Sequence, residues 1–167
     1  YFSEDPLLSG KMGAAFVRGL QSTGTTACVK HMVANNQEVR RMTADSVVDA
    51  ATLNEIYLRS FEIVVREAHP GAIMPAYNRL NGPLCSENPV LLNKVRNEWG
   101  FNGAFISDWG GMDKSIQSVE AGLDLCMPGP RPDHIRAVSR EADNNQLTAE
   151  ALDRAAERMA GLALHYQ

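Results

Sequence analysis

The stretch Phe105-Ile106-Ser107-Asp108-Trp109-Gly110-Gly111 decides which fold this chain of 167 residues adopts. Two apolar residues lead directly into a carboxylate, an indole and two glycines, which is typical of a buried parallel strand that ends in a functional loop. In parallel α/β folds the loops at the C-terminal ends of the strands carry the chemistry. A carboxylate beside an aromatic ring suits a site for sugars. Asp108 could attack an anomeric carbon, and Trp109 could pack against the apolar face of the sugar ring.

Three other apolar segments have the same pattern of a short strand followed by polar residues. They span residues 27–31, 72–78 and 123–127, and their polar side chains include Lys30, His31, Tyr77, Asn78 and Asp124. Amphipathic helices are expected between and around the strands, at about residues 6–21, 53–68, 89–99, 113–121, 133–144 and 148–165. Strands joined by crossover helices lie parallel, so the order predicts an α/β fold of parallel βα repeats. Four such strands form about half of a (β/α)8 barrel of the TIM type.

Local patterns predict how two of these helices begin and pack. Asp5 and Pro6 are typical of an N-cap followed by proline in the first turn. In the helix after them, one apolar face is expected to comprise Leu8, Met12, Ala15, Phe16 and Leu20. The run Thr52-Leu53-Asn54-Glu55 is a possible capping box at the start of the second helix.

Composition places the chain among ordinary globular domains. Hydrophobic residues make up 44% of the sequence and charged residues 22%, and the net charge is −4. This charge argues against nucleic acid or an anionic membrane as the main partner. No apolar run approaches the roughly 18 residues of a membrane-spanning helix. The first residue is not methionine, so we expect the chain to start inside a longer protein, and its localisation stays open.

Cysteine and histidine usage predicts neither a disulfide framework nor a metal site. Cys28 and Cys126 lie in apolar strand-like segments and are expected to be buried thiols. The histidines in helical or loop contexts, His69, His134 and His165, lack the mutual spacing of metal ligands. No glycine-rich phosphate loop follows a strand, so no nucleotide cofactor is expected.

A set of motifs, in order along the chain, resembles glycoside hydrolase family 3 in its β-glucosidase-like branch. The motifs are Ser-Glu-Asp-Pro at residues 3–6, Lys-His-Met-Val-Ala-Asn-Asn-Gln-Glu at 30–38, Arg-Met-Thr at 41–43, Leu-Asn-Glu-Ile-Tyr-Leu at 53–58, Met-Pro-Ala-Tyr-Asn at 74–78, Ser-Asp-Trp-Gly at 107–110 and Gly-Leu-Asp at 122–124. The resemblance covers essentially the whole chain. Each motif alone is weak, but the ordered combination is specific. Met32 replaces the phenylalanine usual in the family, and Cys126 stands where glutamate is common.

The resemblance implies a hydrolase that cleaves β-glucosides or β-xylosides from the chain end with retention of configuration. Asp108 matches the catalytic nucleophile of the family. The positions that match contacts to the bound sugar are Lys30, His31, Arg41, Tyr77 and Trp109. The residues Val33 to Asn36 differ from the loop that the N-acetylglucosaminide branch carries there, which favours glucosides or xylosides and removes that branch's acid/base histidine.

The resemblance also implies that the catalytic unit is incomplete. Residues 1–167 match part of the N-terminal catalytic barrel domain, its C-terminal half, without the early strands or the later region that bears the acid/base. The alternative to an active enzyme is therefore a fragment that only binds sugar or needs a complementary chain. Half a barrel has open edge strands, so we expect the isolated chain to self-associate unless the remainder of the parent protein holds it.

Each candidate residue also has a structural alternative to its role in a site. Asp108 could cap the following helix, Trp109 could be a packed indole, and the Tyr77 hydroxyl could bond only to backbone. His31 could be a core histidine, and Lys30 a surface cation. Arg41 could pair with Glu38 or Asp45 on the surface. We expect Asp124 to order its loop rather than to contact sugar.

Overall fold

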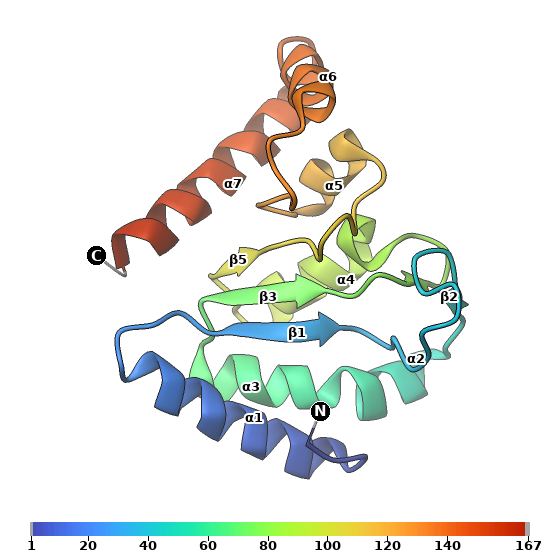
Figure 1. Ribbon diagram of the computed structural model, residues 1–167, viewed down its shortest axis with the longest axis vertical. Helices are drawn as coiled ribbons and strands as arrows, with labels where there is room; N and C mark the ends of the chain where they lie inside the picture. The colour runs from blue at the N-terminus through green and yellow to red at the C-terminus, as the bar shows by residue number, and fades with distance from the viewer. Residues whose placement is uncertain (1, 166–167) are drawn as a thin grey trace.

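A three-stranded parallel sheet lies at the centre of the molecule, in a computed structural model that describes residues 2–165. Its strands are β1 (Cys28–Met32), β3 (Ala72–Pro75) and β5 (Ala104–Phe105), in the order β1-β3-β5. Their arrows point the same way in Figure 1. The predicted α/β fold of parallel βα repeats, about half of a TIM-type barrel, is confirmed.

Helices connect the strands at nearly the positions that the sequence predicts. They are α1 (Pro6–Gln21), the continuous run α2 (Ala50–Thr52), η1 (Leu53–Tyr57) and α3 (Arg59–Ala68), the run α4 (Pro89–Asn93) and η3 (Lys94–Glu98), then α5 (Ser115–Ala121), α6 (Pro132–Ala142) and α7 (Gln146–His165). A short parallel pair, β2 (Asp45–Ser46) with β4 (Arg79–Leu80), and the turn η2 (Cys85–Glu87) complete the order. Among the described helices, none has both the length and the apolar character needed to cross a membrane.

The fourth predicted strand is present only as a single parallel bridge between Ile106 and Leu125. The Leu125 N–H donates to the Phe105 carbonyl, and the Ser107 N–H donates to the Leu125 carbonyl. The Asp124 carboxylate accepts a hydrogen bond from the Phe105 N–H. Residues 123–127 therefore contact β5 without forming further backbone pairs of a strand. In the described part of the chain, the sheet therefore has an edge at β1 and only a minimal fourth strand beyond β5.

The main core lies between the sheet and the helices that cover it. Its fully buried members include Met32, Leu58, Ile73, Leu92, Val95 and Phe105. A smaller apolar cluster lies where α1 meets α3, with Ala14, Val17 and Val64 in contact. Figure 1 shows these two helices side by side below β1. The sheet that carries the polar residues at its end is thus supported by a main core and by a smaller cluster between α1 and α3.

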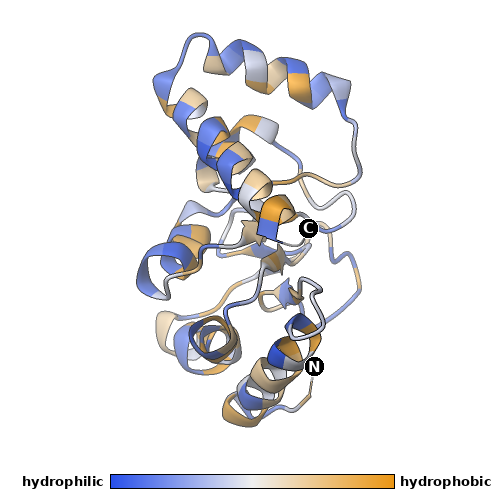
Figure 2. Cartoon of the chain, turned by 90° about the vertical axis from the view of Figure 1, so that its left-hand side faces the viewer, coloured by the Kyte–Doolittle hydropathy of each residue, from blue (hydrophilic) through white to orange (hydrophobic). Residues whose placement is uncertain are grey.

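The predicted packing face of α1 is wrong. The buried positions are Gly10, Ala14 and Val17, whereas Phe16 is 64% exposed. The cause is close approach, because a Cβ atom on Gly10 would lie 2.8 Å from Ile63 of α3. The helix therefore packs through its small residues, and its larger apolar side chains form an outward stripe comprising Leu8, Met12, Phe16 and Leu20. Apolar positions are visible along this helix, beside the N-terminus, in Figure 2.

Two further local predictions are corrected by the structure. The capping box at Thr52 is wrong, because Asp49 is the N-cap and its carboxylate accepts the Thr52 N–H at 3.0 Å. The prediction of a buried thiol is wrong for Cys28, which is exposed on the edge strand, while Cys126 is half-buried. Both corrections depend on residues outside the short motif. An aspartate before the motif caps the helix, and within residues 2–165 no element covers the Cys28 side of the edge strand.

Candidate active site

The C-terminal ends of the three strands deliver the candidate residues to one rim of the sheet. Lys30 and His31 belong to β1, Tyr77 follows β3 by two residues, and Asp108 follows β5 by three. Because the strands are parallel and adjacent, these ends lie at the same edge. The structure therefore brings together side chains that are far apart in the sequence, such as His31 and Asp108, which are separated by 77 positions.

The Asp108 carboxylate faces the His31 imidazole. Its Oδ2 lies 3.3 Å from the His31 Nε2, and the two side chains are 15% and 27% exposed. The other carboxylate oxygen, Oδ1, accepts the Trp109 N–H at 2.7 Å. Burial lowers the pKa of His31 and the charges of Lys30 and Arg41 lower it further, while the Asp108 charge acts in the opposite direction. The imidazole is therefore mainly neutral at pH 7.

Tyr77 connects this carboxylate to the cationic side of the rim. Its hydroxyl donates to the Trp109 carbonyl at 2.8 Å, and the Arg41 guanidinium carbon lies 4.6 Å from its ring centroid. Burial raises the pKa of Tyr77, and a hydrogen bond with Asp108 and the charge of Asp108 raise it further. The phenol thus stays protonated at neutral pH and remains a donor beside the carboxylate.

Arg41 makes the surface ion pair that was expected as the alternative to a site role, and its role in sugar binding stays a prediction. It forms an ion pair with Glu38, which also accepts from the Asn35 side-chain amide at 3.1 Å. Its guanidinium still stacks over Tyr77, so the ion pair holds the cation at the rim rather than removing it. An exposed cation in a fixed position can donate hydrogen bonds to a ligand with several hydroxyl groups.

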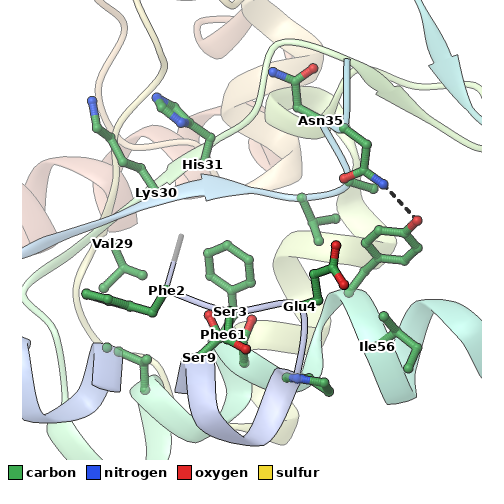
Figure 3. A pocket seen from close by; sticks show the side chains of 18 residues that line it. Phe2, Ser3, Glu4, Ser9, Val29, Lys30, His31, Asn35, Ile56 and Phe61 are labelled. Atoms are coloured by element: carbon green, nitrogen blue, oxygen red, sulfur yellow. Dashed lines mark hydrogen bonds between the residues drawn. The ribbon is translucent and has the colours of Figure 1, made fainter. Parts of the chain in front are cut away.

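Lys30 and His31 stand on the same side of β1, opposite Val29, as Figure 3 shows. The pairing register between β1 and β3 shifts between Lys30 and Met32, which allows two successive side chains to share one side. Next to them, a pocket of about 560 Å³ is lined by residues of β1 and of the helices α1, η1 and α3. Its lining also includes Phe2, Ser3, Glu4, Asn35, Tyr57 and Phe61. The pocket therefore adjoins the candidate site through Lys30 and His31, while Asp108 and Tyr77 are not part of its lining.

Two structural alternatives to a site role fail in the structure. Asp108 does not cap the next helix, because the N-cap of α5 is Lys114 and no side-chain cap bond forms there. Trp109 is not a packed indole, since it is 65% exposed. The aromatic ring thus remains free to contact a ligand at the rim.

Asp124 orders the base of the rim, together with two arginines that the sequence patterns did not single out. Its carboxylate is fully buried and contacts Arg96 at 2.5 Å and Arg158 at 2.7 Å. Burial lowers the pKa of Arg96 to about 10, and the Asp124 charge opposes this effect. Asp124 also accepts the Phe105 N–H at 2.7 Å, which fixes the strand that leads to Asp108. The arginines come from distant helices, so no local spacing could have revealed them.

Two more residues absent from the sequence predictions contact the loop that carries Asp108. The Ser86 hydroxyl donates to the Gly111 carbonyl, and the Glu87 carboxylate accepts the N–H groups of Asp113 and Lys114. The only signal in the sequence is a polar Ser-Glu pair before a helix-starting proline. Over residues 2–165, no group of three or more His, Cys, Asp or Glu side chains is arranged to hold a metal ion.

Residues 1–162 match the model described as the glycosyl hydrolase family 3 N terminal domain. The chain is 47% identical over 160 residues to thermostable beta-glucosidase B of Acetivibrio thermocellus and 45% identical over 159 residues to a beta-glucosidase of Rhizobium radiobacter. Both alignments cover 95% of this chain but only 21% and 19% of those relatives. The chain thus spans about a fifth of the length of the curated relatives it matches.

Solved structures give the same result. Beta-glucosidase 3B of Thermotoga neapolitana, solved in complex with glucose, matches with a TM-score of 0.93 and 44% identity, over 99% of this chain and 24% of the other. The family 3 beta-glucosidase of Bifidobacterium adolescentis matches with a TM-score of 0.94 and 39% identity, over the same shares. With the family model, the ordered motifs and the parallel fold in agreement, this chain belongs to glycosyl hydrolase family 3.

Proposed function

We propose that this chain carries the nucleophile of a retaining, exo-acting β-glycosidase of the glucosidase or xylosidase type, and that Asp108 is that nucleophile. The observation that carries the proposal is the placement of the Asp108 carboxylate, 3.3 Å from His31 at the rim and beside the Tyr77 hydroxyl. The names of the relatives support β-glucoside hydrolysis, and a neighbour that was solved with glucose supports a small sugar as the ligand.

The chemistry assigned to Asp108 is a double displacement. A carboxylate oxygen bonds to the anomeric carbon while the bond from that carbon to the leaving oxygen breaks, and the leaving oxygen takes a proton from a general acid. Water then attacks the same carbon, loses a proton to that group, and releases the sugar and the carboxylate. A carboxylate, an acid and water are sufficient, so the reaction uses no cofactor. The two carboxyl groups of a retaining site are about 5–5.5 Å apart, so the general acid must lie about that far from the Asp108 carboxylate.

The surrounding residues receive the sugar in this proposal. Lys30 and Arg41 offer cationic donors to its hydroxyl groups, and His31 offers a neutral imidazole beside the carboxylate. Tyr77 remains protonated, and its hydroxyl donates to the Trp109 carbonyl, so it holds the residue next to the carboxylate in place. The exposed Trp109 ring provides an apolar face against which a sugar ring can pack.

We assign residues 1–167 to the C-terminal half of the catalytic barrel within the N-terminal domain of such an enzyme. The parallel half-barrel and the edge at β1 support this assignment. So does the alignment, in which about four-fifths of each curated relative lies outside the matched region. The early strands of the barrel and the region that bears the acid/base are then parts that this chain needs for turnover.

A second candidate function is sugar binding without turnover. The open edge beside Lys30 and His31 supports it, because a pocket that lacks the rest of a barrel can hold a ligand and still lack the acid. Under this alternative the rim residues bind glucose weakly, and Asp108 never forms a covalent bond to it. The two candidates make opposite predictions for one chemical probe.

The experiment is incubation of the chain with an aryl 2-deoxy-2-fluoro-β-glucoside that has a strongly activated leaving group, followed by intact-mass analysis. Such a leaving group needs little acid assistance, so the proposal predicts a mass increase of one fluoro-sugar. Asp108→Ala should abolish the adduct, and Asp153→Ala, which removes an exposed carboxylate on α7, should retain it. Perturbation of the Lys30 and His31 signals by glucose, with no adduct, would instead establish the binding-only alternative.

A further inference from the structure

The loop from Ser107 to Lys114 is held at its far end by two residues of the turn η2. Glu87 is buried, and its Oε1 accepts the Asp113 N–H at 2.8 Å and the Lys114 N–H at 2.7 Å. Lys114 is the N-cap of α5 and makes no cap bond with its own side chain. The Glu87 carboxylate therefore accepts the N–H of the N-cap residue and that of the residue before it, which ties the end of the loop to η2.

Ser86 reaches closer to the candidate nucleophile. It is 1% exposed, and its hydroxyl donates to the Gly111 carbonyl at 2.6 Å. The Gly111 N–H in turn donates to the Asp108 backbone carbonyl at 2.8 Å. A Cβ atom on Gly111 would lie 3.3 Å from the Asp108 Cβ and 3.3 Å from the Tyr77 ring. Gly111 is thus in direct contact with both residues, and Ser86 fixes Gly111.

We propose that Ser86 and Glu87, here called the Ser86–Glu87 clamp, are positioning residues that hold the Asp108 carboxylate against His31. The inference rests on the role proposed for Asp108, but the geometry it concerns exists without any sugar. The near end of the loop is held by different groups, since the Gly110 N–H donates to the Met127 carbonyl. The Ser86–Glu87 clamp holds the far end of the loop. Its residues lie 25 to 27 positions before the loop residues that they bind.

The ionisation of His31 reports directly on where Asp108 lies. Lys30, Arg41, Glu38 and Asp108 are charged groups that act on this imidazole. Removing the Asp108 charge by Asp108→Asn should lower the pKa of His31, because a nearby opposite charge that favours the protonated ring is lost. A variant that lets Asp108 move away should give part of this decrease.

The test is an NMR titration of the His31 ring proton in the 167-residue chain. We expect Ser86→Ala and Glu87→Leu to lower the pKa of His31 toward the value in Asp108→Asn. Glu87→Gln should restore the pKa of the original chain, because its amide oxygen can still accept both N–H groups. The matched control is Thr148→Val, which removes another fully buried hydroxyl far along the chain and should leave His31 unchanged.

Three results would overturn the clamp. These are an unchanged His31 pKa in Ser86→Ala, a Glu87→Gln variant that behaves like Glu87→Leu, and an equal shift in Thr148→Val. Ser86→Ala keeps the test decisive if Glu87→Leu does not fold, because it removes a single hydroxyl. The proposed function fails separately, through the absence of a fluoro-sugar adduct in the original chain. The titration needs no adduct, so the two failures are distinguishable.

Discussion

The rim of the sheet and its open side are built differently. In the rim, Tyr77, Ser86, Glu87 and Met127 all bond to the loop that follows Asp108. On the open side, β1 is an edge strand, and the outward stripe of α1 stays exposed, although the Phe2 ring lies beside that of Phe16. The rim thus contains within this chain the contacts that define its shape, whereas the open side presents surfaces that normally require a neighbour.

This contrast explains how a chain with about a fifth of its relatives' length can have a well-defined candidate nucleophile. The contacts around Asp108 come from elements that lie next to one another in the sheet, so they form within a half-barrel. The open side instead depends on whatever completes the barrel. Variants that act on one region and not on the other test this division.

The largest expected difference concerns two phenylalanines. Phe105 is fully buried under the rim and lies 5.0 Å from the Phe101 ring, so Phe105→Ala should lower the free energy of unfolding by about 3–5 kcal/mol. Phe16 is 64% exposed on the open side, and Phe16→Ala should change that energy by less than about 0.5 kcal/mol. Urea denaturation measures both, and equal losses would contradict the division.

The next effect concerns two ion pairs. Asp124→Ala should lower the free energy of unfolding by about 3 kcal/mol. The reason is that Arg96 and Arg158, which are mostly buried, would lose their shared carboxylate partner. Glu67→Ala removes the exposed partner of Lys11 on the open side and should cost less than about 1 kcal/mol. The same denaturation experiment applies. If Asp124→Ala lowers the free energy of unfolding no more than Glu67→Ala does, the ion pairs of the rim are not stronger than those of the open side.

A smaller effect, on association rather than folding, tests the open side itself. We expect the isolated chain to self-associate through the α1 stripe, and the double variant Met12→Glu with Phe16→Glu to shift it toward monomer in sedimentation velocity. Ile135→Glu, at an exposed apolar position on α6, is the matched control and should not change association. A stable, well-folded monomer before any substitution would remove the basis of this prediction.

The smallest effect is the pH dependence that arises at the rim. The pKa of His31 in the folded chain is lower than its ordinary value of 6.5, so the unfolded chain binds the proton more readily. The contribution of His31 to stability is therefore present above about pH 6.5 and is lost as the pH falls through the depressed pKa. The difference in unfolding free energy between the original chain and His31→Gln should change over this range. A constant difference from pH 8 to pH 5 would argue against the assignment.

The sequence predicted the fold where short apolar runs end in polar residues, as β1, β3 and β5 do. It failed where a distant element decides the outcome. The face of α1 was wrong because Gly10 packs against Ile63 of α3, and the fourth strand is shortened where Asp124 binds the Phe105 N–H. Local patterns alone contain neither of these contacts.

The candidate site shows the same limit. The meeting of His31, Tyr77 and Asp108 followed from the rule that parallel strands end at one edge. The Ser86–Glu87 clamp could not be predicted, because its partners lie 25 to 27 residues away with no periodic pattern between them. The role of each rim residue in sugar binding stays a prediction.

The central claim is that the Asp108 carboxylate bonds to the anomeric carbon of a sugar. The most direct measurement is proteolysis of the chain after reaction with the fluoro-glucoside, followed by fragmentation of the modified peptide in a mass spectrometer. The account predicts one fluoro-sugar ester on the Asp108 side chain. An adduct on any other carboxylate, such as Glu38 at the same rim, would contradict it.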